Sequence, residues 1–229
     1  MKINLYAIIN LRLEVRRLEE WIRHNIKLGV DNIYLYNNGM TSPCRTKDSK
    51  KRKFNSTEKY NEDLSDEEVL KIIDDIKDKY DLVTFVPWIY RENREDIYPD
   101  SQISGFKNCI SKYCHEESWW LFMDPDEFLF LNKHENLKDF TNDYKEYNHL
   151  KWGQVKRWTK LNNYEWSGQK WMIKISKIND IKKFEMPHVH NPTRWEQRKK
   201  QFKDPSVIFM NHLGASDTPT EKAFLNIND

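Results

Sequence analysis

The spacing of hydrophobic residues switches between strand and helix periods near the start of the chain. Asn4 to Ile9 is almost continuously apolar, which is typical of a strand buried on both faces. From Val15 to Leu28 the apolar residues recur at helical spacing, and Gly29 is suited to end a helix. Asn32 to Tyr36 is typical of a second strand. Strand, helix and strand in this order predict a parallel βαβ unit.

The same alternation continues up to residue 123. Ser65 and Glu68 form a capping-box pattern, which predicts the start of a second helix. Leu82 to Pro87 predicts a third strand, Pro99 to Tyr113 a third helix, and Trp119 to Met123 a fourth strand. This order predicts an α/β fold with a doubly wound, mostly parallel sheet and helices on both faces.

Beyond Glu127 the pattern loosens. One weak helical stretch, Leu137 to Tyr147, accompanies short aromatic segments typical of strands at Trp152 to Trp158, Trp171 to Lys177 and Val207 to Met210. We therefore expect a mixed C-terminal region beside the parallel sheet. A length of 229 residues favours a single domain spanning residues 1–229.

Composition and charge exclude several classes of protein. Lys plus Arg total 38 and Asp plus Glu total 36, and this balance argues against nucleic acid as the main partner. The six glycines lie at least ten residues apart, which excludes the dinucleotide-binding and P-loop glycine motifs. No apolar run approaches the roughly 20 residues of a membrane span, and three cysteines cannot form a full disulfide set. We expect a cytoplasmic protein without an integral membrane segment.

The clearest candidate for chemistry is the sequence Asp124-Pro125-Asp126-Glu127. It follows the predicted strand Trp119 to Met123, and open α/β sheets bind ligands at the carboxyl ends of their strands. Continued extended backbone would project Asp124 and Asp126 to the same side. Two carboxylates held close together repel unless a cation lies between them, and Mg²⁺ or Mn²⁺ prefers such oxygen ligands. A solvated acidic turn is the alternative, but the hydrophobic segments on both sides favour a ligand site.

Several segments together resemble the family 2-like and family 92-like glycosyltransferases. The similar segments are Glu14, Glu20 to Ile22, Leu28 to Asn38, Gln102, Cys109, Trp120 to Leu129, Asn211, His212, Ser216 and Lys222. The resemblance implies a GT-A-type fold with Mn²⁺ or Mg²⁺ as cofactor. It also implies transfer of a sugar from a nucleotide-diphosphate sugar. We expect a carbohydrate or glycoconjugate hydroxyl as acceptor and inversion at the anomeric carbon, and we favour a UDP-sugar as donor. Two positions depart from the family pattern: Asn37 stands where the family has Asp, and Leu13 where it has Asn.

The resemblance also implies roles for individual residues. Asp126 would coordinate the cation directly, while Asp124 would contact the ribose or bind the metal through water. His212 would be a further metal ligand; the alternative is a surface histidine in a frayed C-terminal tail. Lys222 would contact a phosphate of the donor. These assignments combine the acidic cluster with a segment near the end of the chain.

The base and ribose of the nucleotide are expected at the same sheet edge. Asn37 and Asn38 close the second predicted strand there, and Arg12 and Glu14 follow the end of the first. We therefore expect residues 1–131 to form a nucleotide-sugar-binding half and residues 132–229 an acceptor-side half.

Transfer to a hydroxyl with inversion needs a general base near the acceptor. Glu185 is the first candidate, followed by Glu165 and His188, whereas Glu127 lies too close to the metal cluster to be favoured. Alternatively, His188 and His190 could bind a metal in a hydrolase.

Two other functions would use the same features. A metal-dependent phosphotransferase or hydrolase would use the same Asp cluster, and a non-catalytic nucleotide-sugar-binding protein would keep the fold without turnover. Tryptophans can also form platforms on which sugars stack. Trp152, Trp158 and Trp166 are the candidates that we expect to be partly exposed.

Overall fold

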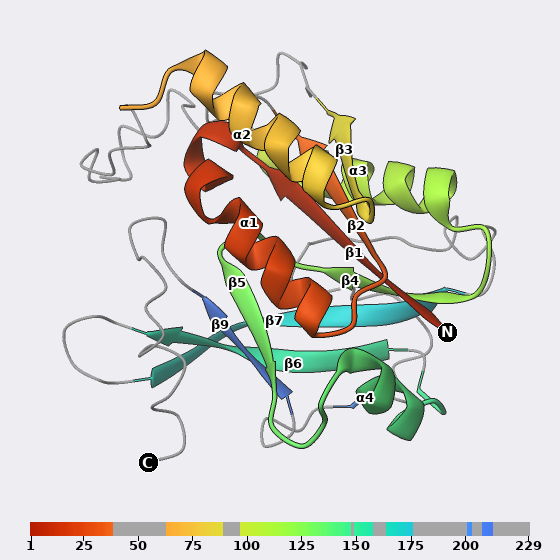
Figure 1. Ribbon diagram of the computed structural model, residues 1–229. Helices are drawn as coiled ribbons and strands as arrows, with labels where there is room; N and C mark the ends of the chain where they lie inside the picture. Colours follow the sequence, from red (N-terminus) through yellow and green to blue (C-terminus); the bar gives the residue numbers. More distant parts are fainter. Residues whose placement is uncertain are drawn as a thin grey trace.

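The computed structural model describes residues 1–38, 63–88, 97–147, 149–157, 164–175, 201–202 and 208–212. Its first half contains β1 (Lys2–Ile9), α1 (Leu11–Lys27), β2 (Asn32–Asn37), α2 (Asp66–Lys79), β3 (Val83–Pro87), α3 (Ile97–Tyr113) and β4 (Ser118–Phe122). Its second half contains β5 (Glu127–Leu131), α4 (Leu137–Asp143), β6 (His149–Arg157), β7 (Tyr164–Ile175), β8 (Gln201–Phe202) and β9 (Ile208–His212). Figure 1 shows how these elements are arranged.

The strands form one sheet in the order β3-β2-β1-β4-β7-β6-β9-β5, with β8 beside β6. β3, β2, β1 and β4 are parallel, so their carboxyl ends meet at one edge of the sheet. β7 pairs antiparallel with β4 and β6, while β9 is parallel to β6 and antiparallel to β5. The predicted α/β fold, a parallel sheet with a mixed C-terminal region, is confirmed.

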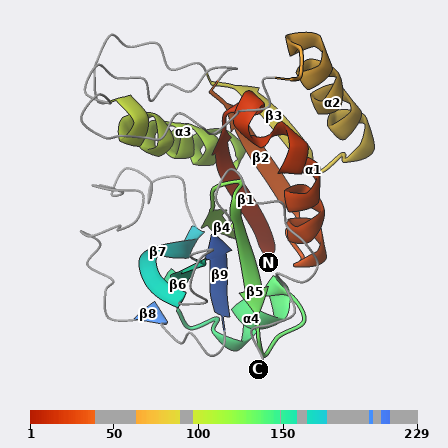
Figure 2. The ribbon, with the colours of Figure 1, turned by 90° about the vertical axis from the view of Figure 1, so that its left-hand side faces the viewer.

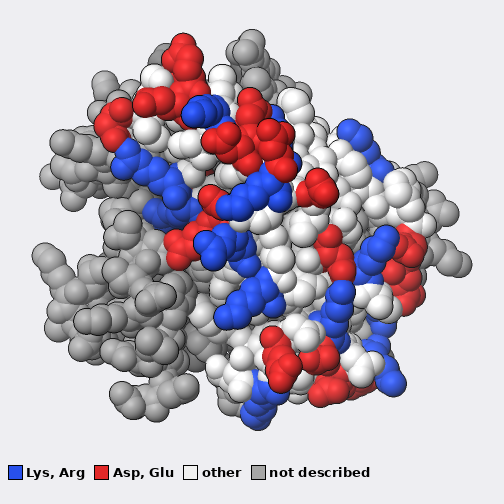
Figure 3. All heavy atoms as spheres, in the orientation of Figure 1, with Lys and Arg blue, Asp and Glu red and all other residues white. Residues whose placement is uncertain are grey.

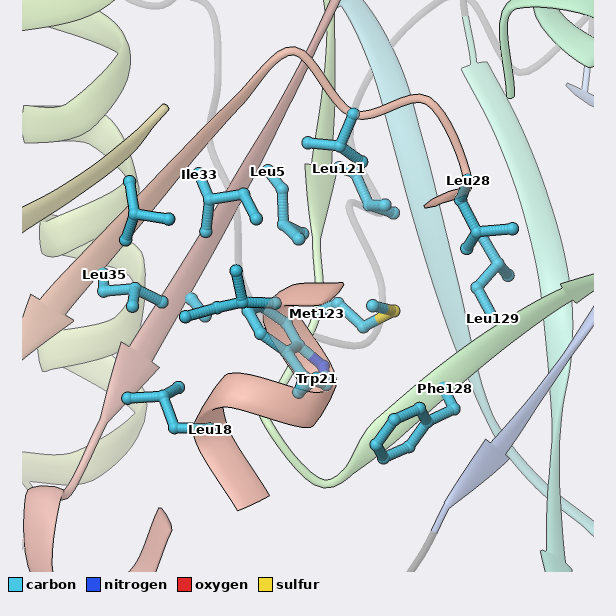
Figure 4. Packing of buried hydrophobic residues seen from close by; sticks show 14 of the residues in the cluster. Leu5, Leu18, Trp21, Leu28, Ile33, Leu35, Leu121, Met123, Phe128 and Leu129 are labelled. Atoms are coloured by element: carbon cyan, nitrogen blue, oxygen red, sulfur yellow. The ribbon is translucent and has the colours of Figure 1, made fainter. Parts of the chain in front are cut away.

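Helices cover both faces of the parallel part of the sheet. α1 and α2 lie on one face and α3 lies on the other (Figures 1 and 2). Successive residues of β1 face opposite layers, so Leu5 and Ala7 belong to the core beneath α1 while Tyr6 and Ile8 belong to the core beneath α3. Figure 4 shows the first of these cores, with Trp21 of α1 among side chains of the neighbouring strands. Burial on both faces explains why β1 is apolar almost throughout.

Local signals set the helix ends as the sequence predicts. Gly29 follows α1 with a φ of 87°, a backbone conformation that residues with a Cβ rarely adopt. At the start of α2, the Ser65 hydroxyl accepts a hydrogen bond from the Glu68 amide at 3.2 Å. The Glu68 carboxylate accepts one in return from the Ser65 amide at 2.7 Å. This pair is the predicted capping box.

The strand β5 is an element that the sequence pattern does not predict. It pairs with β9 along one edge, and α1 covers its other edge. The Trp21 indole donates a hydrogen bond to the Glu127 carbonyl at 2.9 Å, and His24 Nε2 donates one to the Leu129 carbonyl at 2.8 Å. Helix side chains therefore bond alternate carbonyls of this strand, which would otherwise be an open sheet edge.

The expectation of a partly exposed Trp152 is wrong. Its side chain is 2% exposed and belongs to the core beneath α1, because β6 continues the sheet and contributes to the same hydrophobic layer. Trp158 and the side chain of Trp166 lie outside the described residues.

Charges of both signs are interspersed on the face formed by α1 and α2 (Figure 3). Lys79 of α2 donates to the Glu19 carboxylate of α1 at 2.5 Å, and Arg16 pairs with Asp63. Exposed pairs of this kind contribute little stability. None of the helices in the described part of the chain is both long enough and apolar enough to cross a membrane.

Candidate functional site

The acidic cluster lies at the carboxyl end of β4, beside the end of β1. The Met123 amide still donates to a β1 carbonyl at 3.2 Å, and the chain then turns at Pro125 and Asp126. The Glu127 amide donates to the Asp124 carbonyl at 3.0 Å and closes this turn. The expectation of continued extended backbone is therefore wrong, because the chain reverses here to enter β5. Proline suits the second position of such a turn.

The turn brings three carboxylates together. One oxygen from each of Asp124, Asp126 and Glu127 lies within 4.8 Å of the others. Both Asp side chains are half-buried, whereas Glu127 is 1% exposed. Carboxylate oxygens this close can share one hard divalent cation such as Mg²⁺ or Mn²⁺. The residues present therefore fit the cofactor that the sequence predicts.

Polar residues at the ends of β1 and β2 lie at the same sheet edge as this acidic turn. The Asn38 amide donates to the last carbonyl of β1 at 2.9 Å, and the Asn37 carbonyl accepts from the amide that follows β3 at 2.8 Å. Both asparagine side chains are half-buried. Glu14, in the first turn of α1, is also half-buried, while the side chain of Arg12 lies outside the described residues.

Asn10 belongs to this edge as well, although the sequence pattern does not single it out. It precedes α1 with extended backbone (φ −106°, ψ 112°), but its side chain makes no capping hydrogen bond. Within the described part of the chain, its Oδ1 and Nδ2 are both buried and have no hydrogen-bond partner. Asparagine at a helix start normally caps the helix, and buried amides are normally bonded. An unsatisfied amide at the ligand edge of the sheet therefore points to a role other than capping.

The strand register pairs residues from the second half of the chain, directly or through a neighbouring strand, with Glu127 of the acidic turn. His212 of β9 pairs with Glu127 of β5 on one side and with Lys156 of β6 on the other. Lys156 pairs in turn with Glu165 of β7. These four residues form a cross-strand row, of which only the Glu127 side chain is among the described ones. The other predicted site residues lie outside the described part of the chain: Glu185, His188 and Lys222.

Burial raises the pKa values of three polar groups in the layer beneath α3. It raises the pKa of Tyr34 to about 12 and also raises the pKa values of Tyr36 and Cys109. The Tyr36 hydroxyl donates to the Asn108 side-chain oxygen at 2.8 Å. These groups therefore add no negative charge near neutral pH to that of the acidic turn.

Comparisons with known proteins give partial matches. No family model matches the chain. It is 27% identical over 135 residues to a glycosyltransferase family 92 protein of Oryza sativa subsp. japonica, a match that covers 58% of this chain and 17% of that protein. It is similar in structure to S. aureus TarS 1–349 in complex with UDP-GlcNAc, with a TM-score of 0.50, 9% identity, and coverage of 96% of this chain and 62% of that chain. For a UDP-glucose pyrophosphorylase from Acinetobacter baumanii the TM-score is 0.45 and the identity 9%, with coverage of 93% and 86%.

The curated relative and the TarS structure show that the chain has a glycosyltransferase-like fold. At 9% identity the structural similarity concerns the fold. The chain spans about 17% of the length of the curated relative.

Proposed function

We propose that the protein is a metal-dependent glycosyltransferase that moves a sugar from a nucleotide-diphosphate sugar to a hydroxyl acceptor, with inversion at the anomeric carbon. The observation that carries this proposal is the acidic turn at the carboxyl edge of a parallel sheet, within a glycosyltransferase-like fold. The TarS complex with UDP-GlcNAc supports a UDP-sugar as donor. The acceptor in this proposal is a carbohydrate or a glycoconjugate.

Asp124 and Asp126 are the proposed holders of Mn²⁺ or Mg²⁺. Asp126 coordinates the cation directly, and Asp124 contacts the ribose or a metal-bound water. When bound, the cation offsets the negative charge that develops on the diphosphate as the sugar-phosphate bond breaks. The pairing of His212 with Glu127 in the sheet supports His212 as a further ligand. Lys222 completes this proposal as a contact of the diphosphate.

The base and ribose are proposed to bind where β1 and β2 end. Asn37 and Asn38 offer amide donors and acceptors at this edge, and Arg12 and Glu14 belong to the adjoining first turn of α1. The unsatisfied amide of Asn10 supports this placement, because a ligand could supply the hydrogen bonds that it lacks in the described structure. Residues 1–131 then bind the donor, and residues 132–229 face the acceptor.

A general base that takes the proton of the acceptor hydroxyl contributes on the order of 10²- to 10⁴-fold in rate. Glu185, Glu165 and His188 are the candidates. The cross-strand row supports Glu165, because this residue shares the row with His212 and Glu127. We therefore place Glu165 first for mutagenesis.

Titration of UDP with and without Mn²⁺ tests the proposal. We expect Mn²⁺ to tighten UDP binding, and Asp126→Asn to reduce this gain by about tenfold or more, which corresponds to at least about 1.4 kcal/mol. Asp75→Asn is a matched control, because Asp75 is an exposed carboxylate on α2. The metal site would be contradicted if Mn²⁺ does not change the UDP affinity of wild type, or if Mn²⁺ tightens UDP binding by Asp126→Asn as much as it does for wild type.

Turnover assays separate this function from its two alternatives. A transferase releases UDP from a UDP-sugar faster when a suitable carbohydrate acceptor is present. A phosphotransferase or hydrolase with the same carboxylates would cleave phosphate esters instead. A non-catalytic binding protein would bind UDP-sugars but would not transfer the sugar to any of the carbohydrate acceptors tested.

A further inference from the structure

Glu127 is the most constrained of the three acidic side chains. It is 1% exposed, whereas Asp124 and Asp126 are half-buried. Its Oε2 accepts a hydrogen bond from the Asp124 amide at 2.7 Å, and its own amide donates to the Asp124 carbonyl at 3.0 Å. Its carbonyl accepts from the Trp21 indole at 2.9 Å. Side chain, amide and carbonyl of Glu127 are thus all bonded within the fold.

The two contacts between Glu127 and Asp124 form a closed clamp across the turn. A related hydrogen bond occurs at the start of α2, where the Glu68 carboxylate accepts from the Ser65 amide at 2.7 Å. There the glutamate stabilises the first turn of a helix, and at residues 124–127 it stabilises the turn between β4 and β5. A charged acceptor makes such a hydrogen bond stronger than a bond between neutral groups. The clamp therefore helps to determine where the two Asp carboxylates lie.

We propose that Glu127 is a positioning residue, whose carboxylate holds the turn so that Asp124 and Asp126 face one cation together. This inference rests on the proposed function. Asp124 and Asp126 are half-buried, whereas Glu127 is almost fully buried and its carboxylate accepts a hydrogen bond from the backbone of the turn. Glu127 thus acts through the two Asp residues, and neither as the general base nor as the principal ligand.

Two substitutions separate the reach of this side chain from its charge. Glu127→Gln keeps an oxygen acceptor at the same distance along the side chain but removes the negative charge. Glu127→Asp keeps the charge but is one methylene shorter, so it loses the hydrogen bond to the Asp124 amide. A positioning role predicts that the Asp variant is the weaker of the two. A role as metal ligand predicts that the Gln variant needs more Mn²⁺ than wild type to reach its limiting UDP affinity, and a role as general base predicts wild-type UDP affinity in both variants.

The test is a UDP titration at a Mn²⁺ concentration beyond which the apparent Kd for UDP no longer changes. At that concentration, the charge lost in Glu127→Gln no longer acts through metal affinity. We expect Glu127→Gln to bind UDP within about threefold of wild type and Glu127→Asp to bind it about tenfold or more weakly, as for a lost hydrogen bond to a charged group. Wild-type affinity in Glu127→Asp, or an equal loss in Glu127→Gln, would overturn the proposal.

Amide hydrogen exchange at Asp124, measured without metal, reports on the clamp independently of the proposed function. We expect protection in wild type and Glu127→Gln and faster exchange in Glu127→Asp, and equal protection in all three would overturn the clamp. Glu68→Asp breaks the related contact on α2 and should leave UDP affinity unchanged.

Two further experimental outcomes also test the positioning role of Glu127. If Glu127→Asp does not fold, Glu127→Gln decides: UDP affinity within about threefold of wild type supports the proposal, and a loss of about tenfold or more overturns it. If wild type itself binds neither UDP nor GDP with Mn²⁺, the proposed function is wrong, and the positioning role is overturned with it.

Discussion

The buried amide of Asn10 allows a test in which stability and binding change in opposite directions. The side chain makes no capping hydrogen bond, and within the described residues its two polar atoms have no partner. Asn10→Leu replaces the amide by an apolar group of similar shape, so it removes a desolvation cost without breaking a hydrogen bond. We expect the variant to be more stable than wild type and to bind nucleotide more weakly.

The magnitude follows from the cost of the two unsatisfied atoms. A buried polar atom without a partner costs about 1–3 kcal/mol, and the larger leucine offsets part of the relief. We therefore expect a net gain of about 1–3 kcal/mol in the free energy of unfolding. For a chain of this length 1 kcal/mol corresponds to about 2–4 °C in Tm, so the expected rise is roughly 2–12 °C. Loss of the proposed contact between Asn10 and the nucleoside should weaken UDP binding by about tenfold.

Thermal unfolding without ligand and UDP titration with Mn²⁺ measure the two effects on one preparation. Asn25→Leu is the control, because it makes the same change in α1 at a fully buried residue whose Nδ2 donates to the Trp21 carbonyl at 2.8 Å, while within the described residues only its Oδ1 has no partner. Because the control loses this hydrogen bond, it should have a lower Tm than Asn10→Leu, and it should leave the Kd for UDP unchanged. A lower Tm in Asn10→Leu would show that the amide has a structural role, and an unchanged Kd would exclude it from nucleotide binding. Either result refutes the reasoning.

Three further predictions concern packing, pH and β9. Gly105→Ala brings a Cβ into collision with the Tyr6 hydroxyl and should lower the free energy of unfolding by about 1–3 kcal/mol. Adding Tyr6→Phe to this variant should restore part of the lost stability, and no restoration would exclude the contact as the cause. Burial lowers the pKa of His24 below its unfolded value of about 6.5, so the folded state binds fewer protons and stability falls as pH drops below about 6.5. The glutamine of His24→Gln can still donate to the Leu129 carbonyl. This variant should reduce the change in the free energy of unfolding between about pH 7.5 and 5.5, measured by denaturant unfolding, whereas an equally large change would assign the pH dependence to other groups. His212→Ala should weaken Mn²⁺ binding measured in the presence of UDP, and an unchanged affinity would leave β9 without a role in metal binding.

Local signals account for the parts of the fold that can be predicted from the sequence. The apolar run of β1, the helix stop at Gly29 and the capping box at Ser65 each act within a few residues, so periodicity and end signals suffice. β5 is different, because its five residues form a strand by pairing with β9, far along the chain. Strand propensity depends strongly on such partners, and a local pattern does not contain them.

In the candidate site, too, one part can be predicted from local sequence signals and another part depends on long-range pairing. Asp124 and Asp126 can be located from the sequence, because the carboxyl ends of parallel strands meet at one edge of the sheet. The row that contains Glu165 and His212 depends on the pairing of β7, β6, β9 and β5, which no local pattern specifies. Asn10 stands out only through the burial of an amide without partners, and burial is a property of the folded chain.

α1 connects the two sides of this site. It begins directly after Asn10 at the end of β1, and further along the helix Trp21 and His24 bond the carbonyls of Glu127 and Leu129 in β5. Among the described strands, β9 is the one that pairs with β5, so the position of β5 relative to the parallel sheet also depends on these helix contacts. The edge built from β1 and β2 and the acidic turn that leads into β5 are therefore held in place by one helix. Because Trp21 packs in the core and its indole also bonds the Glu127 carbonyl, packing under α1 affects the relative positions of the three carboxylates.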